Sequence, residues 1–390
     1  MDVKAILITG VQQPGVQSGG GAPEFVAGAP IATLDVLGSP LVVRVAEQLL
    51  AGGVSSVAIV SDADASCPAA LRRDAARANV RFISAGGAQL WRECESIFQE
   101  FTDAELVIVW RMGAYAELDL GELVQAHIHQ RSRVTQVCDP AGEGLGIFAI
   151  SGSRRNDAAF LFRHNLQESR TPCSAYAAHG YSNRLRTAAD LRRLTVDALH
   201  LRNRIHPIGR EIKPGVWLGR GARIQKGARV LAPGYIGPYS LVRTSAVLTR
   251  CSVVEHHSQI DCGSMIEDST ILPFTYVGAG LDACHSIVGN RRLLSLRRNV
   301  EVEITDPRLI GMVSENAGVR TAVSMGALFS FLPRQIFRGV FAKSHREPPS
   351  LPEAVQTPSA ALRETGTLQP SPDATQFPAN MAVARRYGNE

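Results

Sequence analysis

Residues 212–276 decide the fold, and they read IKPGVWLGRGARIQKGARVLAPGYIGPYSLVRTSAVLTRCSVVEHHSQIDCGSMIEDSTILPFTY. An aliphatic residue returns here at every sixth position, and a small residue stands four positions after each until the bulky Tyr276. This period matches neither a helix face nor a strand, so each repeating unit must turn a corner. The repeat predicts a parallel β-helix with the aliphatic side chains stacked inside. The aliphatic positions are Ile212, Leu218, Ile224, Val230, Ile236, Val242, Leu248, Val254, Ile260, Ile266 and Leu272, and the small ones are Val216, Ala222, Ala228, Gly234, Ser240, Ala246, Ser252, Ser258, Ser264 and Thr270.

This run resembles the left-handed β-helix of hexapeptide-repeat proteins, in which each coil uses three hexapeptides. Such domains occur in acyltransferases and as C-terminal domains of sugar-phosphate nucleotidyltransferases. They commonly associate through their flat sides. The resemblance therefore implies a left-handed coil and a homo-oligomer formed through the β-helix.

Composition is typical of a soluble protein of two or three domains, with 390 residues, 45% of them hydrophobic and 20% charged. There is no apolar run of about 18 residues, and the N-terminus lacks a signal-peptide pattern, so we expect a cytoplasmic protein with no membrane partner. The cysteines are scattered without a Cys-x-x-Cys pair, which argues against a disulfide framework and a zinc site. Since no compact basic block with interleaved aromatics occurs, we expect no nucleic-acid partner.

Apolar runs alternate with amphipathic segments before the repeat. We expect strands at 3–9, 57–60, 80–83, 106–110, 134–137 and 145–150, and helices at 41–50, 68–78, 89–101 and 120–130. Strands that are apolar on both faces and alternate with helices predict a doubly wound, mostly parallel sheet. Ser39 and Pro40 read as the N-cap and first residue of the first helix, and Thr187 with Asp190 as a partial capping box of a later helix.

These patterns divide the chain into five segments. Residues 1–185 form the α/β domain, with 155–183 as additions to its sheet, and 186–204 form a linking helix. Residues 205–311 form the β-helix, whose register is lost after Tyr276 apart from one imperfect coil. Residues 312–343 are a short, partly helical extension. Residues 344–390, rich in Pro, Ser, Thr and Gln, form a disordered tail.

The α/β segment resembles the sugar-phosphate nucleotidyltransferases, also called NDP-sugar pyrophosphorylases. The match rests on an ordered series of motifs over about residues 3–290, each in the order that the family has them. The resemblance implies a nucleotide or sugar-nucleotide ligand, bound at Thr9, Gly10, Gly86 and Gly87. The motifs are the first strand and its loop start at 3–10, Leu37-Gly38-Ser39-Pro40-Leu41, the Gly53-Val54 step, Ala85-Gly86-Gly87-Ala88 and Leu118-Asp119-Leu120.

The family's catalytic residues do not carry over. No Arg stands in the loop after Gly10, Ile31 occupies the place of a lysine, and no lysine occurs between residues 5 and 212. The two metal-binding carboxylates are replaced by Trp110-Arg111-Met112-Gly113 and Tyr181-Ser182-Asn183. Because phosphoryl transfer depends on positioning and charge neutralisation, we expect impaired or absent catalysis, with Mg²⁺ required for any residual transfer. We therefore expect a binding, regulatory or assembly subunit of sugar-nucleotide or polysaccharide metabolism.

Three other groups leave alternatives open. His285 or His257 could be the general base of a hexapeptide-repeat acyltransferase, or a solvated turn residue. The cluster Arg291, Arg292, Arg297 and Arg298 could bind an anion or form a solvated face. Ser61-Asp62-Ala63-Asp64 could be a displaced metal site at a strand end or a set of turn residues.

Overall fold

The computed structural model describes residues 2–9, 25–62, 79–164, 166 and 173–313. The first part, which we call the α/β part, is built on a seven-stranded sheet with strand order β10-β8-β9-β6-β1-β4-β5. The central strands pair in parallel, and β9 runs antiparallel to β6 and β8. The strands are β1 Val3–Thr9, β4 Ser56–Asp62, β5 Val80–Ala85, β6 Leu106–Arg111, β8 Val134–Cys138, β9 Gly144–Ser151 and β10 Ser174–Ala177, with small pairs β2 Phe25–Val26, β3 Ala29–Pro30, β7 Ala114–Ala116 and β11 Ser182–Arg184.

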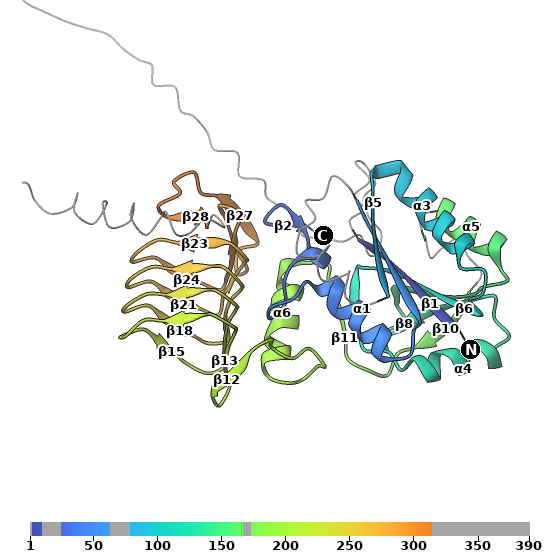
Figure 1. The fold of residues 1–390 in the computed structure, drawn as a ribbon, viewed down its shortest axis with the longest axis horizontal. Coiled ribbons are helices and arrows are strands. Elements are labelled where there is room, and N and C mark those ends of the chain that lie inside the picture. Colours follow the sequence, from blue (N-terminus) through green and yellow to red (C-terminus); the bar gives the residue numbers. More distant parts are fainter. Residues whose placement is uncertain (1, 10–24, 63–78, 165, 167–172, 314–390) are drawn as a thin grey trace, which may run out of the picture. The chain divides into compact units, whose positions relative to one another are not determined.

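Helices cover both faces of the sheet because alternate residues of its buried strands point to opposite sides. Ala5 and Leu7 of β1 join a core with α1, α4 and α6, whereas Ile6 and Ile8 join a core with α3 and α5. Figure 1 shows α3 and α5 together on one side of the sheet. The prediction of an α/β fold with mostly parallel strands is confirmed. The helices are η1 Ile31–Thr33, α1 Leu41–Ala51, α3 Gly87–Glu100, α4 Leu120–His129, α5 Arg155–Arg163 and α6 Ala188–Leu199.

The predicted helix ends and positions agree with the structure at α6 and differ from it at α1 and α5. The capping box of α6 is complete, since the Asp190 backbone N–H donates to Thr187 Oγ1 and the Thr187 backbone N–H donates to the Asp190 carboxylate. The N-cap of α1 is Pro40 and not Ser39, because Pro40 itself has extended backbone angles. Residues 155–163 form helix α5, within the segment 155–183 that is predicted to add to the sheet. The helix expected at 68–78 lies outside the described residues.

The second part, residues 210–312, is built from three sheets whose strands alternate along the chain, and we call it the coiled region. Val216 lies beside Gly234, and Gly234 beside Ser252, so the chain returns to the same sheet after eighteen residues. This is a β-helix-like arrangement; the left hand of its coil stays a prediction. The eight-stranded sheet holds β12 Arg210–Lys213, β13 Val216–Leu218, β16 Gly234–Ile236, β19 Ser252–Val254, β22 Thr270–Ile271, β25 Ser286–Gly289, β26 Arg292–Ser295 and β27 Val300–Glu303. The five-stranded sheet holds β14 Arg223–Ile224, β17 Leu241–Val242, β20 Gln259–Ile260, β23 Thr275–Val277 and β28 Ile310–Met312, and the four-stranded sheet holds β15 Arg229–Val230, β18 Val247–Thr249, β21 Met265–Glu267 and β24 Asp282–Cys284.

The predicted aliphatic ladder holds from Leu218 to Ile266 and then slips by one residue, whereas Ile212 lies on β12, which is antiparallel to β13, and is not part of this core. Ile271, not Leu272, joins the core of the coiled region, and Leu272 instead faces the core shared with the α/β part. The register pairs Val253 with Thr270, which is one residue short of the earlier spacing. A slip of one residue turns each side chain to the opposite face of its strand. Sequence reading at a strict period therefore assigned Leu272 to the wrong face.

The slip also explains why Tyr276 looked like an exception. Ser269 and Thr275 are fully buried, so they and not Thr270 and Tyr276 fill the places of small residues. The coils continue beyond Tyr276, with Val277, Ala283 and Val288 in the core, so the register is shifted there and not lost. Hydroxyls in these places tie successive coils: Ser258 Oγ donates to the Leu272 carbonyl, and the Thr275 backbone N–H donates to Ser258 Oγ.

The α/β part and the coiled region share one core. Outward-facing residues of the eight-stranded sheet, among them Tyr235, Val253 and Ile287, pack with Leu191 and Leu194 of α6. Helix α6 lies within the predicted linking segment 186–204. No helix in the described ranges is long and apolar enough to pass through a bilayer. The predicted extension and tail, residues 314–390, lie outside the described residues.

Candidate functional site

The carboxyl ends of the parallel strands bring together most of the predicted nucleotide-binding residues. Thr9 ends β1 beside Ser61 of β4, and Asp62 pairs with Ala85, which ends β5. Gly86 and Gly87 follow immediately and begin helix α3. Arg111, at the end of β6, pairs with Ile8. Ligands of open α/β sheets gather at this edge, and Gly10, the fourth predicted residue, lies outside the described residues.

Gly86 and Gly87 form the amino end of α3. Gly86 is the N-cap with extended backbone and supplies no side-chain cap of its own, and the first turn of the helix has no acidic residue. A Cβ built at either glycine would meet no atom within 4 Å among the described residues. The first N–H groups of a helix and its dipole favour a negative charge at this end. The arrangement can therefore accept a phosphate group.

The Thr9 side chain is buried and does not face a ligand. It is only 1% exposed, and its hydroxyl donates to the Val60 carbonyl over a long 3.5 Å. The side chain therefore lies between strands β1 and β4. Any contribution of Thr9 to binding would come through the backbone at the end of β1.

The two positions where the family resemblance leads one to expect metal-binding carboxylates do not fit Mg²⁺. Arg111 is a cation, and its neighbours Trp110 and Met112 are fully buried in the core. Asn183 donates its amide to the Asp190 carbonyl at 3.1 Å, which leaves a single neutral oxygen. Mg²⁺ needs near-octahedral oxygen ligands, usually with carboxylates. In the described part of the chain, no group of three or more His, Cys, Asp or Glu side chains is placed to hold a metal.

The motif at residues 61–64 is predicted to be either a displaced metal site or a set of turn residues, and both alternatives stay predictions. Asp62 lies on β4, and only its backbone position is described, whereas residues 63 and 64 lie outside the described ranges.

A hollow of about 550 Å³ lies at the opposite edge of the sheet, beside Lys4, Ser56 and Arg81. It is remote from the carboxyl ends of the strands and from every predicted site residue.

A buried carboxylate that sequence reading missed joins the coiled region to the α/β part. Glu255 has no exposed surface, and its two oxygens accept the backbone N–H groups of Leu37 at 2.8 Å and Gly38 at 2.9 Å. Leu37 and Gly38 present these groups because both have positive φ, 55° and 99°. A Cβ at Gly38 would lie 2.2 Å from the Tyr235 hydroxyl, so the Leu-Gly-Ser-Pro motif needs its glycine there.

Burial controls the protonation of this carboxyl. It raises the pKa of Glu255 to about 8, and the nearby Asp35 carboxylate acts in the same direction. The two backbone N–H groups and Arg44 lower the pKa and only partly offset burial. Arg44 donates to the Val36 and Leu37 carbonyls, so it stabilises the same turn. Glu255 is a structural carboxyl whose charge state changes near neutral pH.

His257, a predicted acyltransferase base, lies in an aromatic stack on one corner of the coiled region. Tyr239, His257 and Phe274 occupy this corner in successive coils, and the rings of His257 and Phe274 are stacked with centroids 5.0 Å apart. The His257 Nδ1 atom lies 2.9 Å from His256 Nδ1. His256 Nε2 lies 3.1 Å from an Asp35 oxygen. The stack therefore connects to the Glu255 turn through His256.

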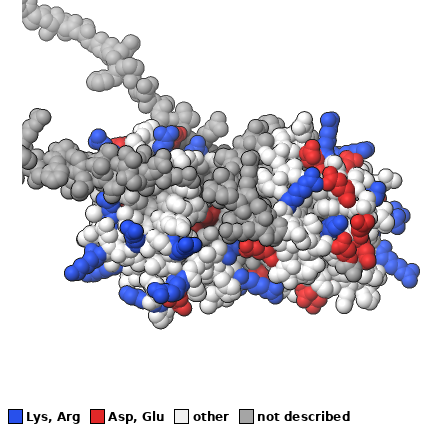
Figure 2. Space-filling view, in the orientation of Figure 1, with Lys and Arg blue, Asp and Glu red and all other residues white. Residues whose placement is uncertain are grey.

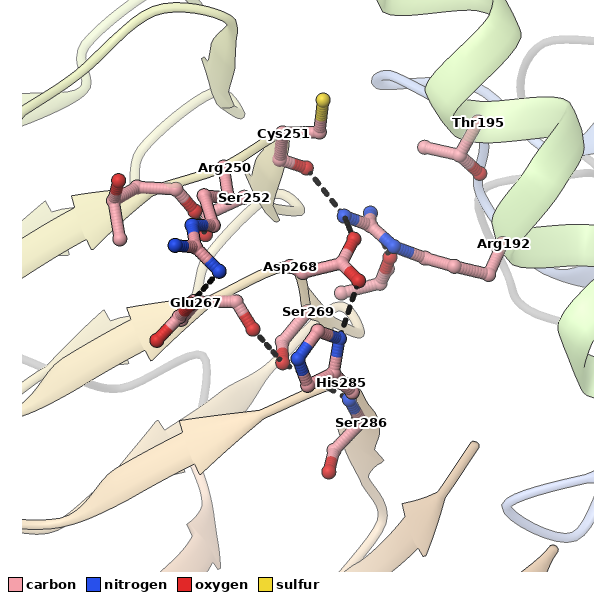
Figure 3. Close-up of polar contacts among 12 residues, drawn as sticks. Arg192, Thr195, Arg250, Cys251, Ser252, Glu267, Asp268, Ser269, His285 and Ser286 are labelled. Carbon is pink, nitrogen blue, oxygen red and sulfur yellow. Dashed lines mark hydrogen bonds and ion pairs between the residues drawn. The ribbon is translucent and has the colours of Figure 1, made fainter. Parts of the chain in front are cut away.

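His285, the other predicted base, is held between a carboxylate and a guanidinium. Its Nδ1 lies 2.6 Å from Asp268 Oδ2, and Arg297 donates to its Nε2. Figure 3 shows Asp268 between His285 and Arg192 of helix α6. The corner at Asp268 and the corner at His285 are each one residue shorter than the earlier corners. Asp268 and His285 therefore lie at the same corner of two successive coils. Carboxylate orientation suits a general base, but the Arg297 contact occupies the nitrogen that would accept a proton.

Arg192, which sequence reading also missed, fixes helix α6 to this corner. It is 5% exposed and donates to Asp268 Oδ1 at 2.9 Å, to the Cys251 carbonyl at 2.7 Å and to Thr270 Oγ1 at 3.0 Å. Of the predicted arginine cluster, Arg292 pairs with Glu301 and Arg297 contacts His285, while Arg291 and Arg298 are exposed. The cluster therefore does not converge on one anion site.

The crystal structure of HddC from Yersinia pseudotuberculosis is similar to this chain, with 14% sequence identity and a TM-score of 0.36. The similarity covers 50% of this chain and 98% of that chain. No protein-family model matches the chain, and no curated protein matches it.

Proposed function

We propose that this chain is a sugar-phosphate nucleotidyltransferase homologue that binds a nucleotide or sugar nucleotide without metal-dependent nucleotidyl transfer. The observation that carries the proposal is the position of the amino end of α3, whose N-cap is Gly86, at the carboxyl edge of the parallel strands. The motif series that surrounds this edge supplies the family resemblance. Arg111 and Asn183, at the positions of the metal ligands, argue against Mg²⁺-assisted chemistry.

The proposed role is that of a binding, regulatory or assembly subunit in sugar-nucleotide or polysaccharide metabolism. Assembly would use the sides of the left-handed coil formed by the five-stranded and four-stranded sheets, because the eight-stranded sheet packs against α6. Replacing Arg111 or Asn183 alone would not create a metal site, since one added carboxylate leaves the coordination incomplete.

Gly86→Asp tests the binding site without disturbing the fold. Asp is a favoured N-cap residue, so the helix keeps or gains stability, and the open space around Gly86 accommodates the side chain. The added negative charge should repel a phosphate at this end and weaken nucleotide binding by about tenfold or more, measured by titration calorimetry with nucleoside triphosphates and NDP-sugars.

Gly86→Asn is the matched control, because it caps the helix with a neutral side chain of the same size. It should bind like the unmodified chain. If Asp and Asn variants bind alike, the ligand phosphate does not lie at α3, and the proposed site is wrong. If the unmodified chain binds neither ligand class, the proposed function itself fails.

A second candidate is acyl transfer with His285 as base, favoured by the 2.6 Å contact of its Nδ1 with Asp268. The Asp268 carboxylate would hold the imidazole in one orientation and stabilise its charged form. Titration with acyl-CoA in the same calorimeter separates the two candidates. Heat from acyl-CoA, lost in His285→Gln, would favour the second.

A further inference from the structure

The first coil of the coiled region carries an exposed belt of positive charge. Its six cations are all exposed, and none forms an ion pair with another described residue. Glu211 is the single acidic residue between positions 210 and 229. In Figure 2 basic side chains gather over the part of the surface where Figure 1 labels β12, β13 and β15. These cations, which we call the basic belt, are Arg210, Lys213, Arg220, Arg223, Lys226 and Arg229.

The same coil leaves the end of the aliphatic core uncovered. The inward residues Leu218, Ile224 and Val230 are partly exposed, although their equivalents one coil later are fully buried. Leu231, at the corner beyond β15, is 52% exposed. At the other end of the stack, β28 pairs with β23, and its Ile310 is buried at 4% exposure. Proteins built of stacked coils need a polar cap at each end of the stack. Among the described residues, no segment caps the end formed by the first coil.

Charge excludes two occupants of this apolar end. A second copy docked end to end on the same face would place two basic belts against each other, which costs several kcal/mol of like-charge repulsion. Residues 314–346, the stretch that follows the described chain, carry five Lys and Arg against a single acidic residue, Glu315. They are therefore not the electrostatic complement of the belt either.

We propose that the first coil docks on an anionic lipid surface. The belt would lie among the lipid headgroups, and the apolar end with Leu231 would reach the boundary of the acyl chains. A nucleic acid fits less well, since Trp217 is the only aromatic residue between 210 and 231 and it packs against the shared core. The proposal departs from the expectation of no membrane partner. That expectation came from the sequence, in which the six cations are spaced apart, and they gather on one surface only in the folded coil.

Cosedimentation of the full chain with vesicles tests the proposal. The chain should bind phosphatidylcholine vesicles that contain phosphatidylserine, and not pure phosphatidylcholine vesicles, with binding that weakens as salt is added. The variant R223Q/K226Q/R229Q should lose binding by about fivefold per charge, or roughly a hundredfold in all. None of the three side chains makes a hydrogen bond or ion pair with another described residue, so the fold should be kept.

The matched control is R133Q/R154Q/R155Q, which removes the same net charge from exposed positions of the α/β part. It should bind vesicles like the unmodified chain. Leu231→Ser should weaken vesicle binding several-fold and leave binding to heparin, a soluble polyanion, unchanged.

Three results would overturn the proposal. They are no binding to vesicles with phosphatidylserine at low salt, equal loss in the belt and control variants, and equal binding of Leu231→Ser and the unmodified chain to vesicles. The last result, together with tight heparin binding, would assign the belt to a soluble polyanion instead. These outcomes are independent of nucleotide binding at α3.

Discussion

Replacement of Arg192 by Ala is expected to lower the free energy of unfolding by about 2–4 kcal/mol, because it removes a buried guanidinium and leaves the buried Thr270 hydroxyl and the Cys251 carbonyl without their donor. Arg192 is buried and joins α6 to Asp268, the Cys251 carbonyl and Thr270. Burial lowers the pKa of this guanidinium, and the Asp268 carboxylate partly offsets the shift. The loss should appear as a lower midpoint in urea unfolding at an unchanged slope.

Arg193 supplies the matched control, since it is the next residue on the same helix and is exposed. Arg193→Ala should change stability by no more than about 0.5 kcal/mol. Equal effects of the two substitutions would show that Arg192 does not hold the helix to the coiled region. Such a result would also remove the structural reason for the orientation of Asp268 toward His285.

Replacement of Glu255 by Ala should also lower the free energy of unfolding, by about 2–6 kcal/mol. It removes the acceptor from two buried N–H groups, of Leu37 and Gly38, and each unpaired group costs about 1–3 kcal/mol. Glu303→Ala, at an exposed glutamate for whose side chain no hydrogen bond or ion pair is found among the described residues, is the control and should change stability little. A loss no larger than that of the control would mean that the turn at residues 35–40 relaxes and finds other acceptors.

The same carboxyl should make stability depend on pH. Because burial raises the folded-state pKa of Glu255 from 4.5 to about 8, the folded protein holds a proton in this window that the unfolded chain has released. The stability contributed by Glu255 is therefore fully present below about pH 4.5 and is lost as the pH rises through about 8. Asp35, Arg44, Tyr235 and His256 are the other titratable or charged side chains at this turn. Glu255→Gln should flatten the decline, and an unchanged slope would contradict the assignment.

Sequence reading predicted the large features of the fold because they follow from hydrophobic periodicity. The alternation of apolar strands and helices gave the α/β part, and the six-residue period gave the buried set from Ile236 to Ile266. A strict six-residue period cannot predict the one-residue slip before Ile271, because no particular residue type marks a corner that is one residue shorter. The small residue Ser269 next to Thr270, and Thr275 next to Tyr276, were the available signals of the slip.

The candidate site was predictable in part. Gly86 and Gly87 were predicted from the resemblance of Ala85-Gly86-Gly87-Ala88 to the family's glycine-rich loop, and the structure places them at the start of α3. Glu255 and Arg192 were missed because their partners lie 218 and 76 residues away in sequence, and no local pattern reports such a pair. A charged residue directly after the two valines Val253-Val254 was the only local sign of the first.

Pyrophosphate release tests the central claim most directly. The purified chain is mixed with a nucleoside triphosphate, a sugar 1-phosphate and Mg²⁺, and nucleotide binding is measured in the same sample. We predict saturable binding that Gly86→Asp weakens, with pyrophosphate formed no faster than without protein. Mg²⁺-dependent release of pyrophosphate with repeated turnover, abolished in Gly86→Asp, would contradict the claim and identify an active nucleotidyltransferase.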